Sequence, residues 1–207
     1  MSILVTGGTK GIGLAIALRL AKPGEELFLA YKRDEAAATE AKIQLDRTGV
    51  TTHLMRSDVG SIDDVSSLMK NISHTSGNLD HIVHAAAMIY PTTLLDADLK
   101  KFSKAIETNG LSLLYLVQGA LSLMRDGSSI VFISSLGAHA TNPRSRYAAL
   151  GTGKALAEAL ILYLVPELAP RGIRINAVAP GLVHTSSVAT MVGSEETAKT
   201  VVERATQ

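Results

Sequence analysis

The chain has 207 residues, of which 46% are hydrophobic and 19% charged, so it is long and apolar enough to bury the core of one globular domain, residues 1–207. It contains no cysteine, which excludes disulfides, thiol catalysis and cysteine-ligated zinc. Its 20 basic and 19 acidic residues nearly cancel, and the formal net charge of +1 gives no indication of a nucleic-acid partner.

The N-terminal sequence, MSILVTGG, has only a short apolar run before a glycine turn, unlike a secretion signal. The longest apolar stretch, LILYLVPELA, is interrupted by Pro166 and Glu167, so we expect it to fall short of a membrane span. These two features predict a cytoplasmic protein that has no membrane partner.

Short β-branched runs alternate along the chain with longer helical patterns. The expected strands are residues 3–5, 27–31, 51–56, 81–84, 129–133 and 173–178. Most of these runs are apolar on both faces, which is typical of a parallel sheet covered on both sides. The expected helices are residues 12–21, 35–47, 62–75, 98–124, 147–171 and 190–207. This alternation predicts a three-layer, doubly wound α/β fold with right-handed crossovers.

The first expected strand runs directly into TGGTKGIG, residues 6–13, within which a helix begins. Glycines at such a turn let the backbone approach a diphosphate, whose charge is then met by the N–H groups at the start of the helix. Gly7, Gly11 and Gly13 are the candidates for this role. A strand before the motif and an amphipathic helix after it are the context that a dinucleotide site requires.

Basic residues follow the second expected strand. Lys32 and Arg33 come at its end, Lys10 lies in the glycine turn, and the first carboxylate after the strand is Asp34. Basic residues at this position accommodate the 2′-phosphate of NADP(H), whereas an acidic residue binds the 2′-hydroxyl of NAD(H). The pattern favours NADP(H); a solvated basic loop is the alternative.

Asp58 and Val59 follow the third expected strand. An aspartate at this place can accept a hydrogen bond from the adenine amino group. It can equally cap the helix expected from residue 62, and the sequence leaves both interpretations open.

Tyr147 and Lys154 are separated by seven positions, almost two helical turns, so on one helix they lie within about 20° of one face and about 10 Å apart along the axis. A nearby ammonium favours the phenolate and eases proton exchange at a tyrosine. The alternative is a half-buried tyrosine and a surface lysine on an ordinary amphipathic helix. Gly151 and Gly153 between them are poor helix residues, which indicates a close backbone approach or a helix that starts after Tyr147.

Taken together, the motifs and their order resemble the short-chain dehydrogenase/reductase family, from residue 2 to about residue 187. The motifs are TGGTKGIG, DV at 58, ETN at 107–109, IVFISSLG at 130–137, the Tyr–Lys pair and RINAVAPGLVHT at 174–185. The resemblance implies a Rossmann-type sheet with strand order 3-2-1-4-5-6. Relative to the family the chain is short at its C-terminus, so we expect the seventh strand to be missing.

The resemblance also implies the site residues. The cofactor-binding positions would be Gly7, Thr9, Lys10, Gly11, Ile12, Gly13, Lys32, Arg33, Asp58, Val59, Ala85, Pro180, Gly181 and Thr185. The catalytic set would be Asn109, Ser135, Tyr147 and Lys154. In that set the tyrosine donates the proton, the lysine stabilises it and holds the nicotinamide ribose, and the asparagine tethers a water. Ser134 is the alternative to Ser135, because the usual distance to the tyrosine selects it.

Two departures from the family pattern carry information. Most members have three residues between the tyrosine and the lysine, whereas this chain has six. Six is the spacing of the enoyl-acyl-carrier-protein reductases of the superfamily, which implies a role in fatty acid biosynthesis. The fourth strand ends in His84 and three alanines, where the family usually has Asn-Asn-Ala-Gly. His84 could be a ligand or a base, but we expect a structural histidine.

Three functions are therefore open: an NADPH-dependent enoyl-thioester reductase, which is slightly preferred; a ketone or 3-oxoacyl reductase; and a truncated, non-catalytic NADP(H)-binding module. No metal site is expected. The expected helices 98–124 and 147–171 are apolar over more than one face, and the family's dimers pair the same helices. We therefore expect a homodimer or homotetramer that acts on a small molecule or an acyl thioester.

Overall fold

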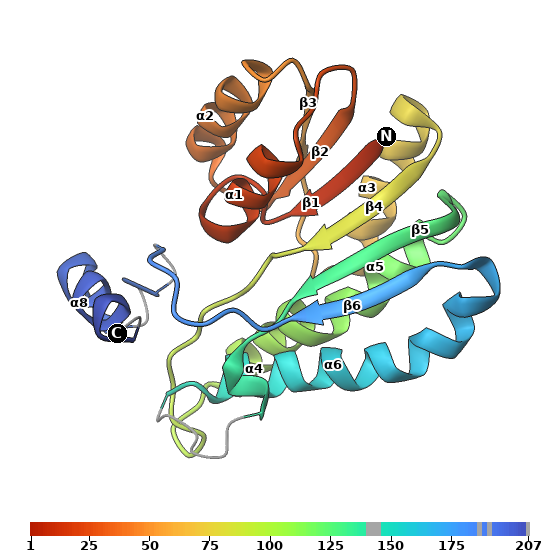
Figure 1. The fold of residues 1–207 in the computed structure, drawn as a ribbon. Coiled ribbons are helices and arrows are strands. Elements are labelled where there is room, and N and C mark those ends of the chain that lie inside the picture. Colours follow the sequence, from red (N-terminus) through yellow and green to blue (C-terminus); the bar gives the residue numbers. More distant parts are fainter. Residues whose placement is uncertain (140–145, 186–187, 190–191, 206–207) are drawn as a thin grey trace.

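A computed structural model describes residues 1–139, 146–185, 188–189 and 192–205 (Figure 1). Its strands form a six-stranded parallel sheet in the order β3-β2-β1-β4-β5-β6. The strands are β1 (Ser2–Thr6), β2 (Glu26–Tyr31), β3 (Thr51–Arg56), β4 (Leu79–His84), β5 (Met124–Ile133) and β6 (Arg174–Val178). The order confirms the expected Rossmann-type fold, and the described residues contain no seventh strand of the sheet.

Helices cover both faces of the sheet (Figure 1). The helices are α1 (Gly11–Leu20), α2 (Glu35–Asp46), α3 (Ile62–Ser76), α4 (Leu99–Ile106), α5 (Ser112–Ala120), α6 (Ala148–Leu168) and α8 (Glu195–Ala205). Of these, α8 lies to one side of the sheet and covers neither face (Figure 1). Side chains of β1 alternate between two cores: Ile3 and Val5 pack with α1 and α2, whereas Leu4 packs with α3, α5 and α6. Because successive strand residues point to opposite faces, both cores need apolar residues, which explains the uninterrupted apolar strands.

The prediction of one long helix over residues 98–124 is wrong. The segment consists of α4, a π-helical turn η1 (Glu107–Leu111) and α5, which ends at Ala120. Met124 pairs with Leu79 and starts β5, five residues earlier than expected. The apolar residues from 121 to 124 continue the helical pattern in the sequence, although they form the turn and the strand that follow.

Helix α6 continues into a 3-10 turn, η3 (Ala169–Arg171), and Pro166 does not interrupt it. The combined segment Ala148–Arg171 is long and apolar enough to cross a membrane, with a mean hydropathy of 1.5 in its most apolar window. We expected this apolar stretch to be too short to span a membrane. By its length and its hydropathy the segment Ala148–Arg171 is not too short, so that expectation is wrong. In the fold, Ala157, Ile161 and Leu164 of this helix pack in the core under the sheet.

Candidate active site

The expected site residues gather around the carboxyl ends of the strands, the edge at which open α/β sheets bind ligands. Thr6 ends β1 beside His84 at the end of β4. Ser134 and Ser135 follow β5, and Pro180 and Thr185 follow β6. The sheet order therefore brings these motifs to one edge.

The glycine turn forms a tight cradle after β1. Gly7 has a φ of +64°, and a Cβ there would lie 2.8 Å from the Cα of Ala86. A Cβ on Gly13 would lie 2.2 Å from the carbonyl oxygen of Gly7, so only glycine lets the helix start this close to the strand. Gly11, with a φ of +54°, faces the side chain of Thr185. The turn therefore leaves room for backbone alone, which the expected approach to a diphosphate requires.

The N-terminus of α1 is open, in contrast to those of the next helices. Asp34, Ser61 and Asp98 accept hydrogen bonds from the first turns of α2, α3 and α4. The residue before α1, Lys10, makes no such bond, and the first turn of α1 has no acidic residue. Free N–H groups at a helix start attract anions, so the residues present fit a phosphate-bearing cofactor.

A cavity of about 510 Å³ lies beside this helix end. It is lined by Gly11, Ile12, Ala15, Ile16, Arg19, Pro180, Val183, His184 and Thr185. Gly11 and Ile12 of the glycine turn thus line the same hollow as the segment after β6. Of the other expected cofactor residues, Thr9 is buried and Gly181 is exposed.

Two of the three expected cations are ion-paired. Nζ of Lys10 lies 2.7 Å from Asp34, and Nζ of Lys32 lies 2.5 Å from Asp58. The hydrogen bond from Lys10 holds the pKa of Asp34 below its ordinary value. Arg33 is exposed and forms no ion pair with any residue that the structure describes.

Asp58 does not cap α3, because Ser61 does. Its carboxylate accepts the Gly60 N–H and pairs with Lys32 and Lys104. Burial raises the pKa of Asp58, but these hydrogen bonds and lysine charges lower it by more, so the net pKa is below the ordinary value. Val59, beside it, is buried. The capping interpretation is wrong.

Asn109 is fully buried in the π-helical turn η1. Its Oδ1 accepts the Met88 N–H at 2.8 Å, and its Nδ2 donates to the Met88 carbonyl at 2.9 Å. The Ala85 N–H donates to the carbonyl of Thr6, so the strand end just before this loop is fixed as well. The Asn109 side chain therefore positions the segment that leaves β4.

Tyr147 lies just before the first residue of α6, with φ −99° and ψ −2°. Its backbone pairs with Thr92, and a Cβ on Gly137 would lie 2.9 Å from Cδ1 of the tyrosine ring. Tyr147 is thus the residue that caps α6, and its carbonyl accepts the Gly151 N–H of the first turn. That its side chain shares one face with Lys154 stays a prediction. The alternative of a later helix start is right.

The two glycines between the tyrosine and the lysine bring α6 against both neighbouring turns. A Cβ on Gly151 would lie 2.7 Å from the Gly137 carbonyl oxygen in η2 (Leu136–His139). A Cβ on Gly153 would lie 2.7 Å from the Cβ of Asn109 in η1. These contacts explain the glycines: the helix that carries Lys154 touches the turns beside the expected serine and asparagine.

Lys154 is only 3% exposed. Its Nζ donates to the Ile133 carbonyl at 2.7 Å and lies 4.2 Å from the centroid of the Phe132 ring. Burial lowers the pKa of Lys154 to about 7, although the charge of Glu158 opposes this. Near neutral pH this lysine can therefore exchange a proton, unlike a surface lysine.

The two candidate serines differ in their partners. Ser134 is buried, and its hydroxyl donates to the carboxylate of Glu158. Ser135 is partly exposed, and its Oγ accepts the Gly137 N–H at 3.2 Å, which leaves its hydroxyl proton for another acceptor. This arrangement favours Ser135, which remains a prediction.

His84 is buried in a chain of hydrogen bonds. Ser112 Oγ donates to the Thr108 carbonyl, so it accepts from His84 Nε2 at 2.7 Å. His84 Nδ1 then accepts from Thr6 Oγ1 at 2.6 Å, and Thr6 Oγ1 accepts the Ala86 N–H. Burial lowers the pKa of His84 well below its ordinary value, and the charge of Lys154 adds to this. The imidazole is neutral and structural, as expected.

Comparisons with known proteins identify the family of this chain. A family model described as "Enoyl-(Acyl carrier protein) reductase" matches residues 7–207. 3-Oxoacyl-[acyl-carrier-protein] reductase FabG of Staphylococcus aureus is 31% identical, over 88% of this chain and 74% of its own length. The chain belongs to the short-chain dehydrogenase/reductase family. This is a family of oxidoreductases.

Two other members show how much of its relatives' length the chain spans. 1-Cyclohexenylcarbonyl-CoA reductase of Streptomyces collinus is 31% identical, and the match covers 89% of this chain but 65% of the relative. A short-chain dehydrogenase from Burkholderia cenocepacia, solved in complex with NADP, has a TM-score of 0.84 at 27% identity, covering 89% of this chain and 75% of the other. The chain thus spans less than two thirds of some curated relatives.

Several residues of this short-chain reductase site could not be identified from motifs. Met88 is held by Asn109, and Glu158 is held by Ser134 and His139. Glu158 comes four positions after Lys154, so helical spacing alone could have placed it on the same face. Nothing in the sequence indicates the contact of Met88, because it depends on a loop. No metal cluster occurs among the described residues.

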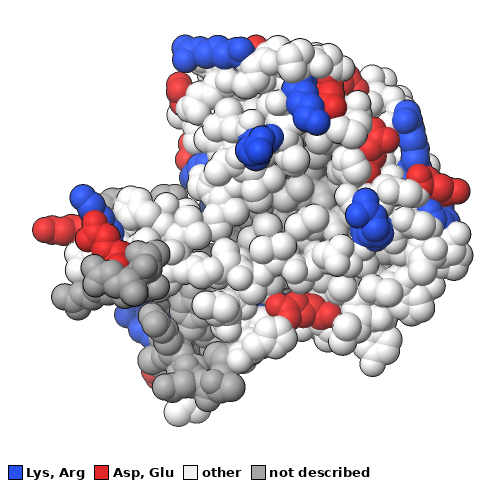
Figure 2. Space-filling model, in the orientation of Figure 1, with Lys and Arg blue, Asp and Glu red and all other residues white. Residues whose placement is uncertain are grey.

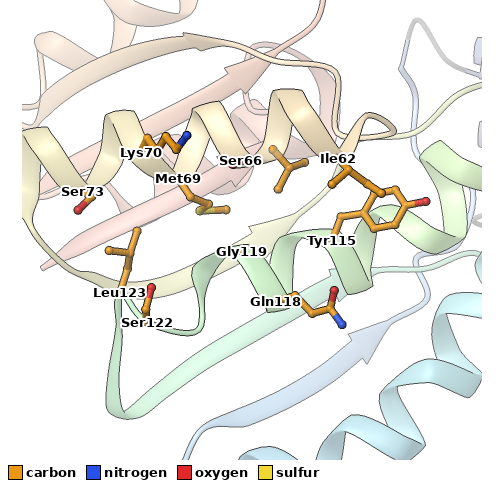
Figure 3. Close-up of a pocket in the computed structure, with 11 residues that line it drawn as sticks. Ile62, Ser66, Met69, Lys70, Ser73, Tyr115, Gln118, Gly119, Ser122 and Leu123 are labelled. Carbon is orange, nitrogen blue, oxygen red and sulfur yellow. The ribbon is translucent and has the colours of Figure 1, made fainter.

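A second hollow of about 490 Å³ lies between α3 and α5, away from these residues. Figure 3 shows Lys70 and Met69 of α3 on one side and Tyr115 and Gln118 of α5 on the other. Gly119 forms part of its wall. It contains none of the candidate site residues.

Proposed function

We propose that this short-chain reductase uses NADPH to reduce an acyl thioester, and that an enoyl thioester is preferred over a 3-oxoacyl thioester. The observation that carries the proposal is the arrangement of Tyr147 and Lys154. The tyrosine precedes α6 and the lysine lies in its second turn, with Gly151 and Gly153 packing the helix on η2 and η1.

The cofactor assignment is supported by the cradle. The uncapped start of α1 and the turn at Gly7, Gly11 and Gly13 would hold the diphosphate, and Arg33 would meet the 2′-phosphate. The neighbour from Burkholderia cenocepacia carries NADP on the same fold. When bound, the nicotinamide supplies the hydride.

The protein residues would handle the proton and the oxygen. The Tyr147 hydroxyl would donate to the substrate oxygen that gains charge, and the Lys154 ammonium would favour the tyrosinate that remains. Ser135 would donate a hydrogen bond to the same oxygen. Asn109 would hold the Met88 backbone, and with it the segment after β4, in place.

Three observations favour the enoyl substrate. The six-residue gap matches the enoyl reductases of the superfamily, the matching family model bears their name, and the relative from Streptomyces collinus is named as a reductase of an unsaturated acyl-CoA. The 3-oxoacyl alternative is favoured by the Staphylococcus aureus relative and by the serines. Both reactions use the same cofactor and tyrosine.

The same family membership suggests a homo-oligomer in the cytoplasm. Leu162 and Tyr163 of α6 are 74% and 75% exposed, and Val165 is 45% exposed. Figure 2 shows few charged side chains over α6 and β6. An apolar helix face of this kind would be covered by a second copy.

The test is NADPH oxidation followed by absorbance, with crotonyl and acetoacetyl thioesters in parallel. Turnover of the crotonyl thioester alone supports the proposal, and turnover of the acetoacetyl thioester alone selects the 3-oxoacyl reductase. Tight NADPH binding without turnover of either would indicate a non-catalytic cofactor-binding module and contradict both.

A further inference from the structure

The carboxylate of Glu158 connects three parts of the site. Glu158 lies on α6 one turn after Lys154, and its side chain is 17% exposed. One oxygen accepts a hydrogen bond from the Ser134 hydroxyl at the end of β5. The other contacts Nε2 of His139, the last residue of η2. A single side chain thus links α6, β5 and η2.

Lys154 is attached to the same strand end. Its Nζ donates to the carbonyl of Ile133, the residue before Ser134. Lys154 and Glu158 therefore hold consecutive residues of the chain after Phe132. Since they are four positions apart on one helix, their side chains are neighbours.

Glu158 is the negatively charged group that interacts with Lys154 in the described part of the chain. In the described part of the chain, the titratable groups that interact with Lys154 are Glu158 on the same helix and His84 from β4. His84 is neutral, because burial lowers its pKa well below the ordinary value. The titratable groups around Glu158 are Lys154 and His139. Glu158 is thus the anion that opposes the loss of the Lys154 proton.

We propose that Glu158 is a positioning residue of the active site: it ties α6 to the end of β5 through Ser134 and to η2 through His139, and its charge favours the protonated form of Lys154. The proposal rests on the proposed reductase function, in which Lys154 must be cationic beside Tyr147. Glu158 makes no contact with the reacting atoms in this scheme and acts through Lys154 and through the turn that follows Ser135.

The first experiment is Glu158→Gln, which keeps the shape and an acceptor for Ser134 but removes the charge. In cofactor-free protein with isotope-labelled lysine, the Lys154 side-chain resonance, assigned by its loss in Lys154→Met, should titrate about one pH unit lower than in the wild type. Glu167→Gln removes an exposed charge from the same helix and should leave the titration unchanged. An unchanged Lys154 titration in Glu158→Gln would overturn the proposal.

Turnover gives a second readout. The cationic lysine is lost as the pH rises through its pKa, so Glu158→Gln should move the high-pH limb of the kcat profile to lower pH. If the wild type reduces neither thioester, the proposed function fails, while the titration of Lys154 still decides the role of Glu158.

His139→Gln tests the link to η2 and does not depend on the folding of the Glu158 variant, because His139 is 71% exposed. Amide hydrogen exchange at Gly137 and Ala138, whose N–H groups bond to Ser135, should become faster. Exchange at the wild-type rate would show that Glu158 does not hold the turn through His139.

Discussion

Tyr147 lies at the residue before α6, and its ring packs on Gly137. Tyr147→Phe removes the hydroxyl and keeps the ring, so we expect kcat to fall by about 100-fold or more while NADPH affinity changes little. The measurements are NADPH oxidation and a fluorescence titration of NADPH binding. Tyr163→Phe, at a 75% exposed position of the same helix, is the matched control and should alter neither. Activity retained in Tyr147→Phe would remove this residue as the proton donor.

Burial of Lys154 also affects stability. Because its pKa is lowered from 10.5 to about 7, the unfolded chain binds more protons than the folded chain between these values. The free energy of unfolding therefore rises with pH through this window, and the cost of burying the charge is greatest below it. Lys154→Met should raise the free energy of unfolding by about 1–2 kcal/mol at pH 6, since the charge is removed and packing is kept.

This prediction is checked by urea denaturation of the wild type and of Lys154→Met at several pH values between about 6 and 10. The advantage of Lys154→Met should shrink as the pH approaches 10, where the wild-type lysine is neutral in the folded state. An advantage that does not depend on pH would mean that the gain comes from packing and not from the charge.

At the scale of elements, the contact between α6 and η1 depends on Gly153. Gly153→Ala would gain up to about 1 kcal/mol of helix propensity, but its Cβ would lie 2.7 Å from the Cβ of Asn109. Overpacking costs more than this gain, so we expect a net loss of about 1–2 kcal/mol in thermal unfolding and reduced turnover. Gly119→Ala in α5 is the control. Its Cβ would meet the flexible Met69 side chain at 3.2 Å and the Val65 side chain at an ordinary 3.4 Å, so the change should be neutral or stabilising.

The sequence predicts an element well where the local pattern of apolar residues and glycines alone determines the structure. The doubly wound α/β fold and the glycine turn followed from the apolar runs and from the position of TGGTKGIG, whereas the strand order came only from the family resemblance. The helix 98–124 was wrong because apolar spacing does not distinguish a helix end from the strand after it. The ion pairs of Lys10 and Lys32 were not foreseen, since each joins elements that are distant in the sequence. Glu158 was not predicted as a site residue for the same reason: its partners Ser134 and His139 lie on other elements, at the end of β5 and in η2.

At the scale of the whole molecule, the exposed apolar face of α6 predicts self-association. Leu162→Glu combined with Tyr163→Glu should reduce the oligomer to a monomer in light scattering. Because both side chains are about three-quarters exposed, the fold should tolerate the change. Ile43→Glu, at a 45% exposed position of α2 on the opposite face of the sheet, should leave the mass unchanged. A wild type that is already monomeric would contradict the expectation.

The order of the strands has a consequence for synthesis on the ribosome. Among the described residues, the segment with α6 is the one long and apolar enough to cross a membrane. The strands β4 and β5 and the helices α3 and α5, which share its core, are all made before it. Of the described strands in this core, β6 alone is made later. The apolar side of α6 can therefore be covered as soon as it emerges, which shortens the time in which it is exposed to chaperones or to other nascent chains.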